Sequence, residues 1–237
     1  MKKVKIGPTL ACADLMNVER DIKILDSIGV DTYHIDIMDG NYVPNYCLSW
    51  DFVKSLKEIT STYIDIHLMT ENVDRDINTA ISLVVWGIAF HYETGKVEER
   101  LHLIKRENIK AGLAVCPETD ISLVFPYLDK LDYILIMGVK PGFSGQSFIP
   151  ASYSRIKALS SIRKERGLDF EIYVDGGIDN ENGPKCKEKG ADILVAGKLC
   201  IFRDKGKLEK QTKEFISPYH KHVSSVNSKT YTYCIPF

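Results

Sequence analysis

The sequence predicts an α/β protein whose single domain is a (β/α)8 TIM barrel. Eight short apolar runs of strand type alternate with amphipathic segments along the 237 residues. Polar and glycine-rich segments follow several of these runs, as at the carboxyl ends of barrel strands. A doubly wound open sheet is the alternative, but it normally has fewer strands and gathers its site at one topological switch point. We therefore expect a barrel domain over residues 1–216 and a C-terminal tail over 217–237.

The expected strands are short runs in which aliphatic and aromatic residues dominate, each bounded by turn residues. They cover residues 4–10, 32–37, 63–68, 87–91, 111–115, 133–137, 171–174 and 193–196. The segments between them carry apolar residues at helical spacing. Helices are expected at 18–28, 50–59, 74–84, 97–107, 121–128, 151–166, 181–189 and 207–216. Gly29 and Gly190 are predicted to end helices, and Asp120 or Asp74 to cap helix N-termini.

Composition excludes several classes of protein. A formal net charge of −1 provides no general attraction to nucleic acid or to an anionic membrane. The six cysteines form no CxxC pair, which indicates reduced thiols. The first apolar stretch is short and is interrupted by Pro8 and Asp14, so it resembles neither a signal peptide nor a membrane span. We expect a cytoplasmic protein. The tail shows no helical or strand period, and we interpret its His220 and His222 as solvated.

Four polar side chains near the ends of expected strands form the candidate site. His34 and Asp36 are two residues apart, so both point to the same face of an extended segment. His67 lies in the next strand, and Asp175 follows a later one. Two imidazoles and two carboxylates suit a divalent cation such as Zn²⁺, Fe²⁺, Mn²⁺ or Co²⁺, and carboxylates can also transfer protons. A single histidine in an apolar run is more often a core residue, but the four together favour a site.

Glycine-rich segments follow the last three expected strands, at 141–146, 175–177 and 196–198. Backbone N–H groups near helix starts in such loops can bind a phosphate group. Each segment alone is weak evidence because glycine is common in turns. Their joint position at one end of a barrel is more specific.

Long motifs in the chain resemble the ribulose-phosphate 3-epimerases and their relatives, the allulose-6-phosphate 3-epimerases. Between about Ile6 and Phe202 these motifs are IGPTLACADL, HIDIMDGNYVPN, IDIHLM, MGVKPGFSGQSFIP, IYVDGGI and ADILVAG. The resemblance implies a TIM barrel and metal-assisted epimerisation at C3 of a ketose phosphate. It implies that the metal ligands are His34, Asp36, His67 and Asp175. It also implies that Asp36 and Asp175 carry the protons through a metal-stabilised enediolate.

The same resemblance and the glycine-rich loops indicate a substrate-binding set, which comprises Thr9, Met38, Met69, Met137, Gly142, Phe143, Ser144, Gly145, Gly176, Gly177, Gly197 and Lys198. In the resembled family such methionines lie against the enediolate, although a methionine at a strand end is more often core packing. Two further carboxylates, Asp65 and Asp39, are expected either to orient the histidines or to cap helices. The expected partners are a ketose phosphate and further copies of the chain, with neither nucleic acid nor membrane.

Departures from the family pattern bear on the substrate. Thr9 stands where Ser is usual, and Gly138, Lys140 and Lys198 replace other polar residues. Lys198 is expected either to bind the phosphate or to extend into solvent. We expect interconversion of D-ribulose 5-phosphate and D-xylulose 5-phosphate. One alternative is epimerisation of D-allulose 6-phosphate to D-fructose 6-phosphate, because the segment HYET at 91–94 resembles the allulose-6-phosphate 3-epimerases. The other alternative is a non-catalytic phosphosugar-binding barrel. A lyase or decarboxylase of similar architecture would be expected to carry a lysine in the HIDIMDG or IDIHLM motif, and neither motif has one.

Overall fold

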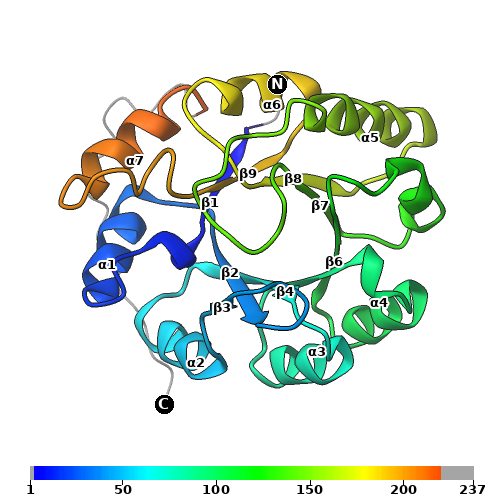
Figure 1. Cartoon of the computed structure of the whole chain (residues 1–237), viewed down its shortest axis with the longest axis horizontal. Helices are drawn as coiled ribbons and strands as arrows, with labels where there is room; N and C mark the ends of the chain where they lie inside the picture. The colour runs from blue at the N-terminus through cyan, green and yellow to red at the C-terminus, as the bar shows by residue number, and fades with distance from the viewer. Residues whose placement is uncertain (1–2, 220–237) are drawn as a thin grey trace, which may run out of the picture.

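Parallel strands form a barrel wall, and helices surround it (Figure 1). The computed structural model describes residues 3–219. The parallel strands are β1 (Lys5–Pro8), β2 (Thr32–Asp39), β4 (Tyr63–Met69), β5 (Gly87–His91), β6 (Lys110–Val115), β7 (Tyr133–Met137), β8 (Glu171–Asp175) and β9 (Ile193–Ala196). They lie in the order β1-β9-β8-β7-β6-β5-β4-β2, and a short strand β3 (Tyr46–Cys47) pairs antiparallel with β2. The predicted fold class is therefore confirmed.

The two ends of this strand order meet between β1 and β2. At the start of β2, Asp31 donates its N–H to Ile6 O at 3.0 Å and accepts the Ile6 N–H on Oδ2 at 2.9 Å. At the other end of the seam, Thr9 forms an isolated parallel bridge with His34. The seam is thus held at its base and at its mouth.

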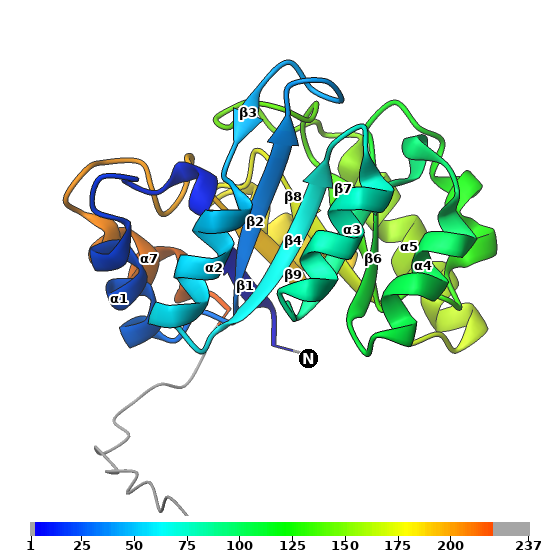
Figure 2. The same cartoon turned by 90° about the horizontal axis from the view of Figure 1, so that it is seen from below.

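The outer layer consists of α1 (Val18–Ile28), α2 (Trp50–Ile59), α3 (Val73–Ser82), α4 (Val97–Arg106), α5 (Ser152–Arg166), α6 (Asn182–Lys189) and α7 (Leu208–Ile216). Short 3₁₀ helices are η1 (Leu10–Cys12), η2 (Tyr92–Thr94) and η3 (Ile121–Tyr127). The carboxyl ends of the strands and β3 lie at one end of the barrel, the upper end in Figure 2. Within residues 3–219, no helix is both long and apolar enough to cross a bilayer.

Several local expectations differ from the structure. The predicted helix at 121–128 is a 3₁₀ helix, because Pro126 has no N–H to donate and disrupts an α-helical turn. Asp120 caps it by accepting the Ser122 N–H, as expected. The expected cap at Asp74 is wrong: Asn72 precedes α3 and accepts the Arg75 N–H. The strand β3 was not predicted, since two residues are too few to show a period.

Glycines end helices at the expected places, and the five cysteines that the structure describes have free thiols. Gly29 and Gly190 both adopt the left-handed conformation that follows a helix, with φ of 81° and 112°. The cysteines within residues 3–219 form no disulfide, as expected. His220, His222 and nearly all of the predicted tail lie outside the described residues.

The barrel interior below the site is filled by aromatic rings. Tyr133 and Tyr173 lie with ring centroids 4.5 Å apart, and both are buried. Small residues on neighbouring strands make room for Tyr133. A Cβ added at Gly112 would lie 2.3 Å from Cζ of Tyr133, whereas one at Gly87 would lie 3.1 Å from its hydroxyl oxygen. The apolar base therefore has no spare volume beside Gly112.

We predict that Gly112→Ala destabilises the fold by about 1–3 kcal/mol, because the new methyl group overlaps a buried ring that has no free space to enter. Gly87→Ala is the milder comparison, since its methyl group would lie 3.1 Å from the hydroxyl oxygen of the same ring, which needs to move by only a few tenths of an ångström. Urea unfolding of both variants measures the difference. Equal stability of the two variants would contradict this account of the barrel base.

Candidate active site

The candidate site lies inside the mouth of the barrel. His34 and Asp36 come from β2, His67 from β4, and Asp175 ends β8. One nitrogen or oxygen from each side chain lies within 4.8 Å of the others, and all four residues are buried. The pairing of β2 with β4 brings the first three together, because Asp36 lies in register with His67, and closure of the barrel places Asp175 opposite them. The structure thus unites the four residues that the sequence singled out.

The donor atoms face a common point. The two nearest carboxylate oxygens, Asp36 Oδ1 and Asp175 Oδ2, lie 3.5 and 3.7 Å from His34 Nε2. They lie 3.1 and 3.6 Å from His67 Nδ1. These separations are close to the edges of about 3.3–3.6 Å in a tetrahedron of nitrogen and oxygen ligands about 2.0–2.2 Å from a zinc-sized ion. The cluster therefore has the donor types and the spacing of a divalent metal site.

An unsatisfied nitrogen supports this interpretation. His34 Nε2 is buried and makes no hydrogen bond within the described part of the chain. A buried polar atom without a partner costs free energy, and a cation at the common point would supply that partner. The residues present therefore fit a divalent cation.

A buried carboxylate fixes the other side of His34. Asp65 Oδ2 lies 2.6 Å from His34 Nδ1, and Asp65 also accepts the Thr32 hydroxyl at 3.1 Å. This leaves Nε2 of His34 directed at the cluster, as a carboxylate–histidine–metal arrangement requires. The expected contact of Asp65 with a histidine is present. Asp39 does not make one: it accepts the Asn41 and Glu71 N–H groups and holds the loops above the strand.

Charge in the cluster favours a cation. Burial alone would lower the pKa of His34, but the carboxylates of Asp65 and Asp36 raise that pKa well above the ordinary value. The opposite happens to Asp36: burial would raise its pKa, but His34 and His67 hold it far below the ordinary value. Protonated histidines therefore occupy the negative environment when no metal ion does.

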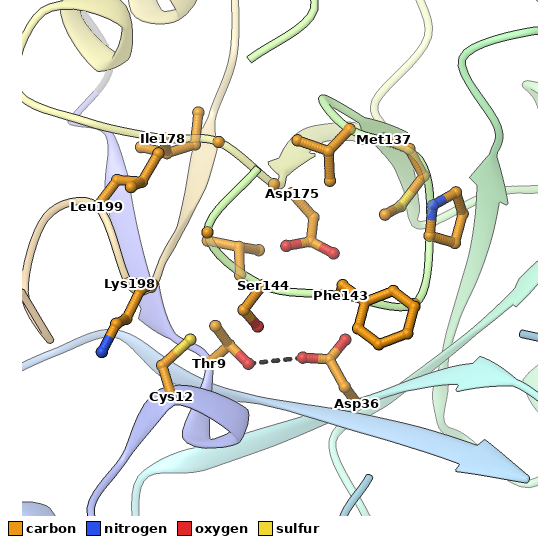
Figure 3. Close-up of a pocket in the computed structure, with 18 of the residues that line it drawn as sticks. Thr9, Cys12, Asp36, Met137, Phe143, Ser144, Asp175, Ile178, Lys198 and Leu199 are labelled. Carbon is orange, nitrogen blue, oxygen red and sulfur yellow. Dashed lines mark hydrogen bonds between the residues drawn. The ribbon is translucent and has the colours of Figure 1, made fainter. Parts of the chain in front are cut away.

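One pocket is lined by Asp36 and Asp175 of the cluster and by all of the predicted substrate-binding residues (Figure 3). Thr9 donates its hydroxyl to Asp36 Oδ2 at 2.6 Å, which ties the first strand to the site. The Lys198 side chain lies at the pocket rim and extends away from Asp36 and Asp175. Six further residues line the pocket and were not predicted, namely Cys12, Val139, Pro141, Ile178, Val195 and Leu199. Val195 could have been found, since it lies in the expected strand at 193–196, directly before the glycine-rich segment at 196–198.

Close packing explains the glycines at the end of β8. Gly177 has φ +71°, and a Cβ there would lie 2.7 Å from the backbone of Phe148. Gly138, one of the departures from the family pattern, has no room either, because its Cβ would lie 2.4 Å from Gly176 O. The Gly138 N–H donates to Asp175 O at 2.6 Å. These contacts fix the backbone that carries Asp175.

A second polar group lies behind His67 and was not predicted. His91 Nε2 is 2.9 Å from His67 Nε2, and His91 Nδ1 is 3.2 Å from Glu93 Oε2. Burial lowers the pKa of His91 to about 4, whereas hydrogen bonds from His91 and Thr119 outweigh burial and lower the pKa of Glu93 to about 2. His91 ends an expected strand, but only the pairing of β4 with β5 puts it beside His67.

Comparison with known proteins identifies the family. The sequence profile of the ribulose-phosphate 3 epimerase family matches residues 5–202. The chain belongs to this family. It is 37% identical over 202 residues to the ribulose-phosphate 3-epimerase of Methanocaldococcus jannaschii, an alignment that covers 85% of this chain and 86% of that protein. It is 38% identical over 199 residues to the ribulose-phosphate 3-epimerase of Escherichia coli, covering 83% and 88%.

Solved structures of other barrel proteins resemble this chain in fold alone. A mutant tryptophan synthase α-subunit from Pyrococcus furiosus aligns with a TM-score of 0.65 at 18% identity, covering 91% of this chain and 99% of that one. A 3-hexulose-6-phosphate synthase aligns with a TM-score of 0.65 at 12% identity, covering 92% and 100%. At such identities the likeness concerns the barrel.

We predict that metal affinity of the chain falls as the pH falls from about 8 to about 5, because protons compete for His34 and His67. The pKa values of both histidines are raised in the metal-free cluster, so the protonated forms persist to higher pH than usual. Each must lose its proton to bind a metal ion, which gives the sign. Chelator competition with zinc across this range measures the effect. A pH-independent affinity would remove both histidines from the ligand set.

Proposed function

We propose that this chain interconverts D-ribulose 5-phosphate and D-xylulose 5-phosphate by exchanging the proton at C3. Family membership supports a ketose-phosphate epimerase. One observation carries the proposed mechanism: Asp36 and Asp175 come from strands far apart in sequence, and their carboxylates point toward one another inside one pocket (Figure 3). Inversion at a carbon beside a ketone needs one group to remove a proton and a second to return a proton to the opposite face.

The four ligand residues would hold the metal ion beside these carboxylates. When bound, a divalent cation supplies positive charge that stabilises the negative oxygens of an enediolate and so makes the C3 proton easier to remove. The Thr9 hydroxyl binds Oδ2 of Asp36 and sets the angle at which this carboxylate meets the substrate. Asp36 takes the C3 proton in one direction of reaction and Asp175 in the other.

Apolar side chains complete the reacting end of the pocket. Met38, Met69 and Met137 line it beside the carboxylates. Their thioether side chains exclude water and offer no proton that could compete with either carboxylate at an enediolate carbon. We assign these three methionines to protection of the intermediate.

The opposite end of the pocket suits the phosphate. Gly176, Gly177 and Gly197 follow β8 and β9 there, and the loop from Gly142 to Gly145 borders them. Glycines let backbone N–H groups approach an anion closely. Lys198 makes no ion pair within residues 3–219, and its side chain is flexible enough to reach a phosphate at the rim.

Asp36→Asn is expected to lower turnover by about 10²–10⁴-fold, because it keeps the side-chain volume and removes the proton acceptor. The measurement is the exchange of the C3 hydrogen of ribulose 5-phosphate with solvent deuterium, at a metal occupancy matched to the unmodified protein. Asp51→Asn is the control, since Asp51 lies on α2 with 88% of its side chain exposed. Turnover of Asp36→Asn near that of the control would exclude the acid/base role.

The same exchange assay distinguishes the possible activities. Exchange with ribulose 5-phosphate and little with allulose 6-phosphate supports the proposal. The reverse preference identifies a hexulose-phosphate epimerase, and no exchange with either sugar at full metal occupancy identifies a non-catalytic barrel. Either of these two outcomes contradicts the proposed function.

Lys198→Met is expected to raise the KM for the sugar phosphate about tenfold with little change in kcat, the effect of losing one charge-assisted hydrogen bond to phosphate. The salt dependence of KM should also weaken. Lys140→Met is the matched control, because Lys140 is exposed on the neighbouring loop and does not line the pocket. An unchanged KM in Lys198→Met would show that this ammonium group stays in solvent.

A further inference from the structure

The two ring nitrogens of His67 have different surroundings. Its Nδ1 faces Asp36 Oδ1 at 3.1 Å and Asp175 Oδ2 at 3.6 Å, inside the metal cluster. Its Nε2 faces away from the cluster and lies 2.9 Å from Nε2 of His91. Both rings are buried, and their planes are 30° apart with centroids at 5.0 Å. Water has no access to this contact, so the two nitrogens must satisfy each other.

A metal ion on His67 determines where every proton of this pair lies. A histidine that binds metal through Nδ1 is neutral and carries its proton on Nε2. His67 then donates from Nε2, so His91 must accept with an unprotonated Nε2. A neutral His91 therefore carries its own proton on Nδ1, which faces Glu93 Oε2 at 3.2 Å.

Glu93 is positioned to accept a hydrogen bond from the Nδ1–H group of His91. Its other oxygen, Oε1, accepts the Cys116 N–H at 2.9 Å and also the Thr119 hydroxyl. Both donors belong to the segment that follows β6, so the carboxylate is anchored from a second strand. The ring of Tyr42 covers His91, with centroids 4.9 Å apart. The contacts leave Oε2 as the oxygen that serves His91.

We propose that His91 and Glu93 are positioning residues that hold His67 in the orientation and tautomer needed for metal binding through Nδ1. The proposal rests on the proposed function only in requiring a metal ion in the cluster. His34 meets its carboxylate, Asp65, directly at 2.6 Å, whereas His67 reaches Glu93 through the imidazole of His91. Each of the two proposed metal-binding histidines is thus oriented by a carboxylate, directly for His34 and through one intervening imidazole for His67.

Behind His67, the side chains of His91, Glu93 and Cys116 have donor atoms close enough together for a second metal site. His91 Nδ1 lies 3.4 Å from Cys116 Sγ and 3.2 Å from Glu93 Oε2, distances close to the edges of about 3.3–3.7 Å in a tetrahedral zinc site. A metal on His91 Nδ1 would put the proton of His91 on Nε2. That proton would meet the Nε2 proton of His67 across 2.9 Å. The two sites therefore exclude each other, and the cluster at His34 has more ligands.

Nitrogen NMR of the zinc-loaded protein with ¹⁵N-labelled histidine tests the proposal directly, without substrate. We expect one zinc ion per chain, His67 protonated on Nε2 and His91 protonated on Nδ1. A His91 ring protonated on Nε2 in the zinc-loaded protein would overturn the proposal. So would a second equivalent of zinc that is lost in Cys116→Ala.

Variants provide an independent readout. Glu93→Gln presents an amide N–H to His91 when its oxygen keeps the Cys116 and Thr119 donors, which favours the wrong tautomer. We expect zinc affinity to fall by about 10–100-fold and the visible absorption bands of the cobalt-loaded protein to shift. Cys116→Ala is the matched control, because it removes the thiol beside His91 and should leave both readouts unchanged. Unchanged zinc affinity in Glu93→Gln would overturn the proposal.

These outcomes separate the present proposal from the proposed function. A chain that binds zinc with the expected tautomers but exchanges no ketose phosphate would contradict the function alone. A chain that epimerises ribulose 5-phosphate with His91 protonated on Nε2 would contradict the positioning role alone.

Discussion

The register between β2 and β4 is the constraint on which the site depends. It places His34 beside Asp65 and Asp36 beside His67, all on the inner face of the barrel. Side chains alternate between the faces of a strand, so a shift of one residue would turn His67 toward the helices and bring an aliphatic residue in. The same pairing therefore supplies three residues of the candidate metal cluster, among them the carboxylate proposed to transfer protons, and the carboxylate that contacts His34. Burial of the aliphatic residues between them, such as Ile35 and Ile66, fixes that register.

Burial and charge act against each other in this site, and charge prevails. Imidazoles and carboxylates at this depth would each lose their charged forms if isolated. Because they are neighbours, the pKa of Asp36 is lowered and the pKa values of His34 and His67 are raised, so both histidines hold protons that a metal ion would have to displace. Farther from the cluster the balance changes: His91 stays neutral although it lies against a ligand. His67, whose pKa is raised, and His91, whose pKa is lowered, are thus only 2.9 Å apart.

The sequence was informative about the features that depend on local patterns. Runs such as 87–91, 133–137 and 193–196 coincide with strands, because buried barrel strands are continuous apolar runs between turn residues. The four residues of the candidate cluster could be found because polar side chains stand out within apolar strand-type runs. Features that depend on pairing could not be found in this way. The contact of His91 with His67 follows only from the pairing of β4 with β5, and the sequence left two roles open for Asp65, orienting a histidine or capping a helix.

The seam between β1 and β2 has a consequence for folding. At the mouth of the barrel, Thr9 forms a β-bridge with His34 and donates a hydrogen bond to Asp36. The residue that closes the barrel wall there therefore also contacts the site. The strand β1 lies near the start of the chain but pairs with β9, which is synthesised almost last. Contacts so distant in sequence form late because closing a long loop is entropically costly. Assembly of the cluster in its final geometry thus indicates that the barrel wall from β1 to β9 has closed.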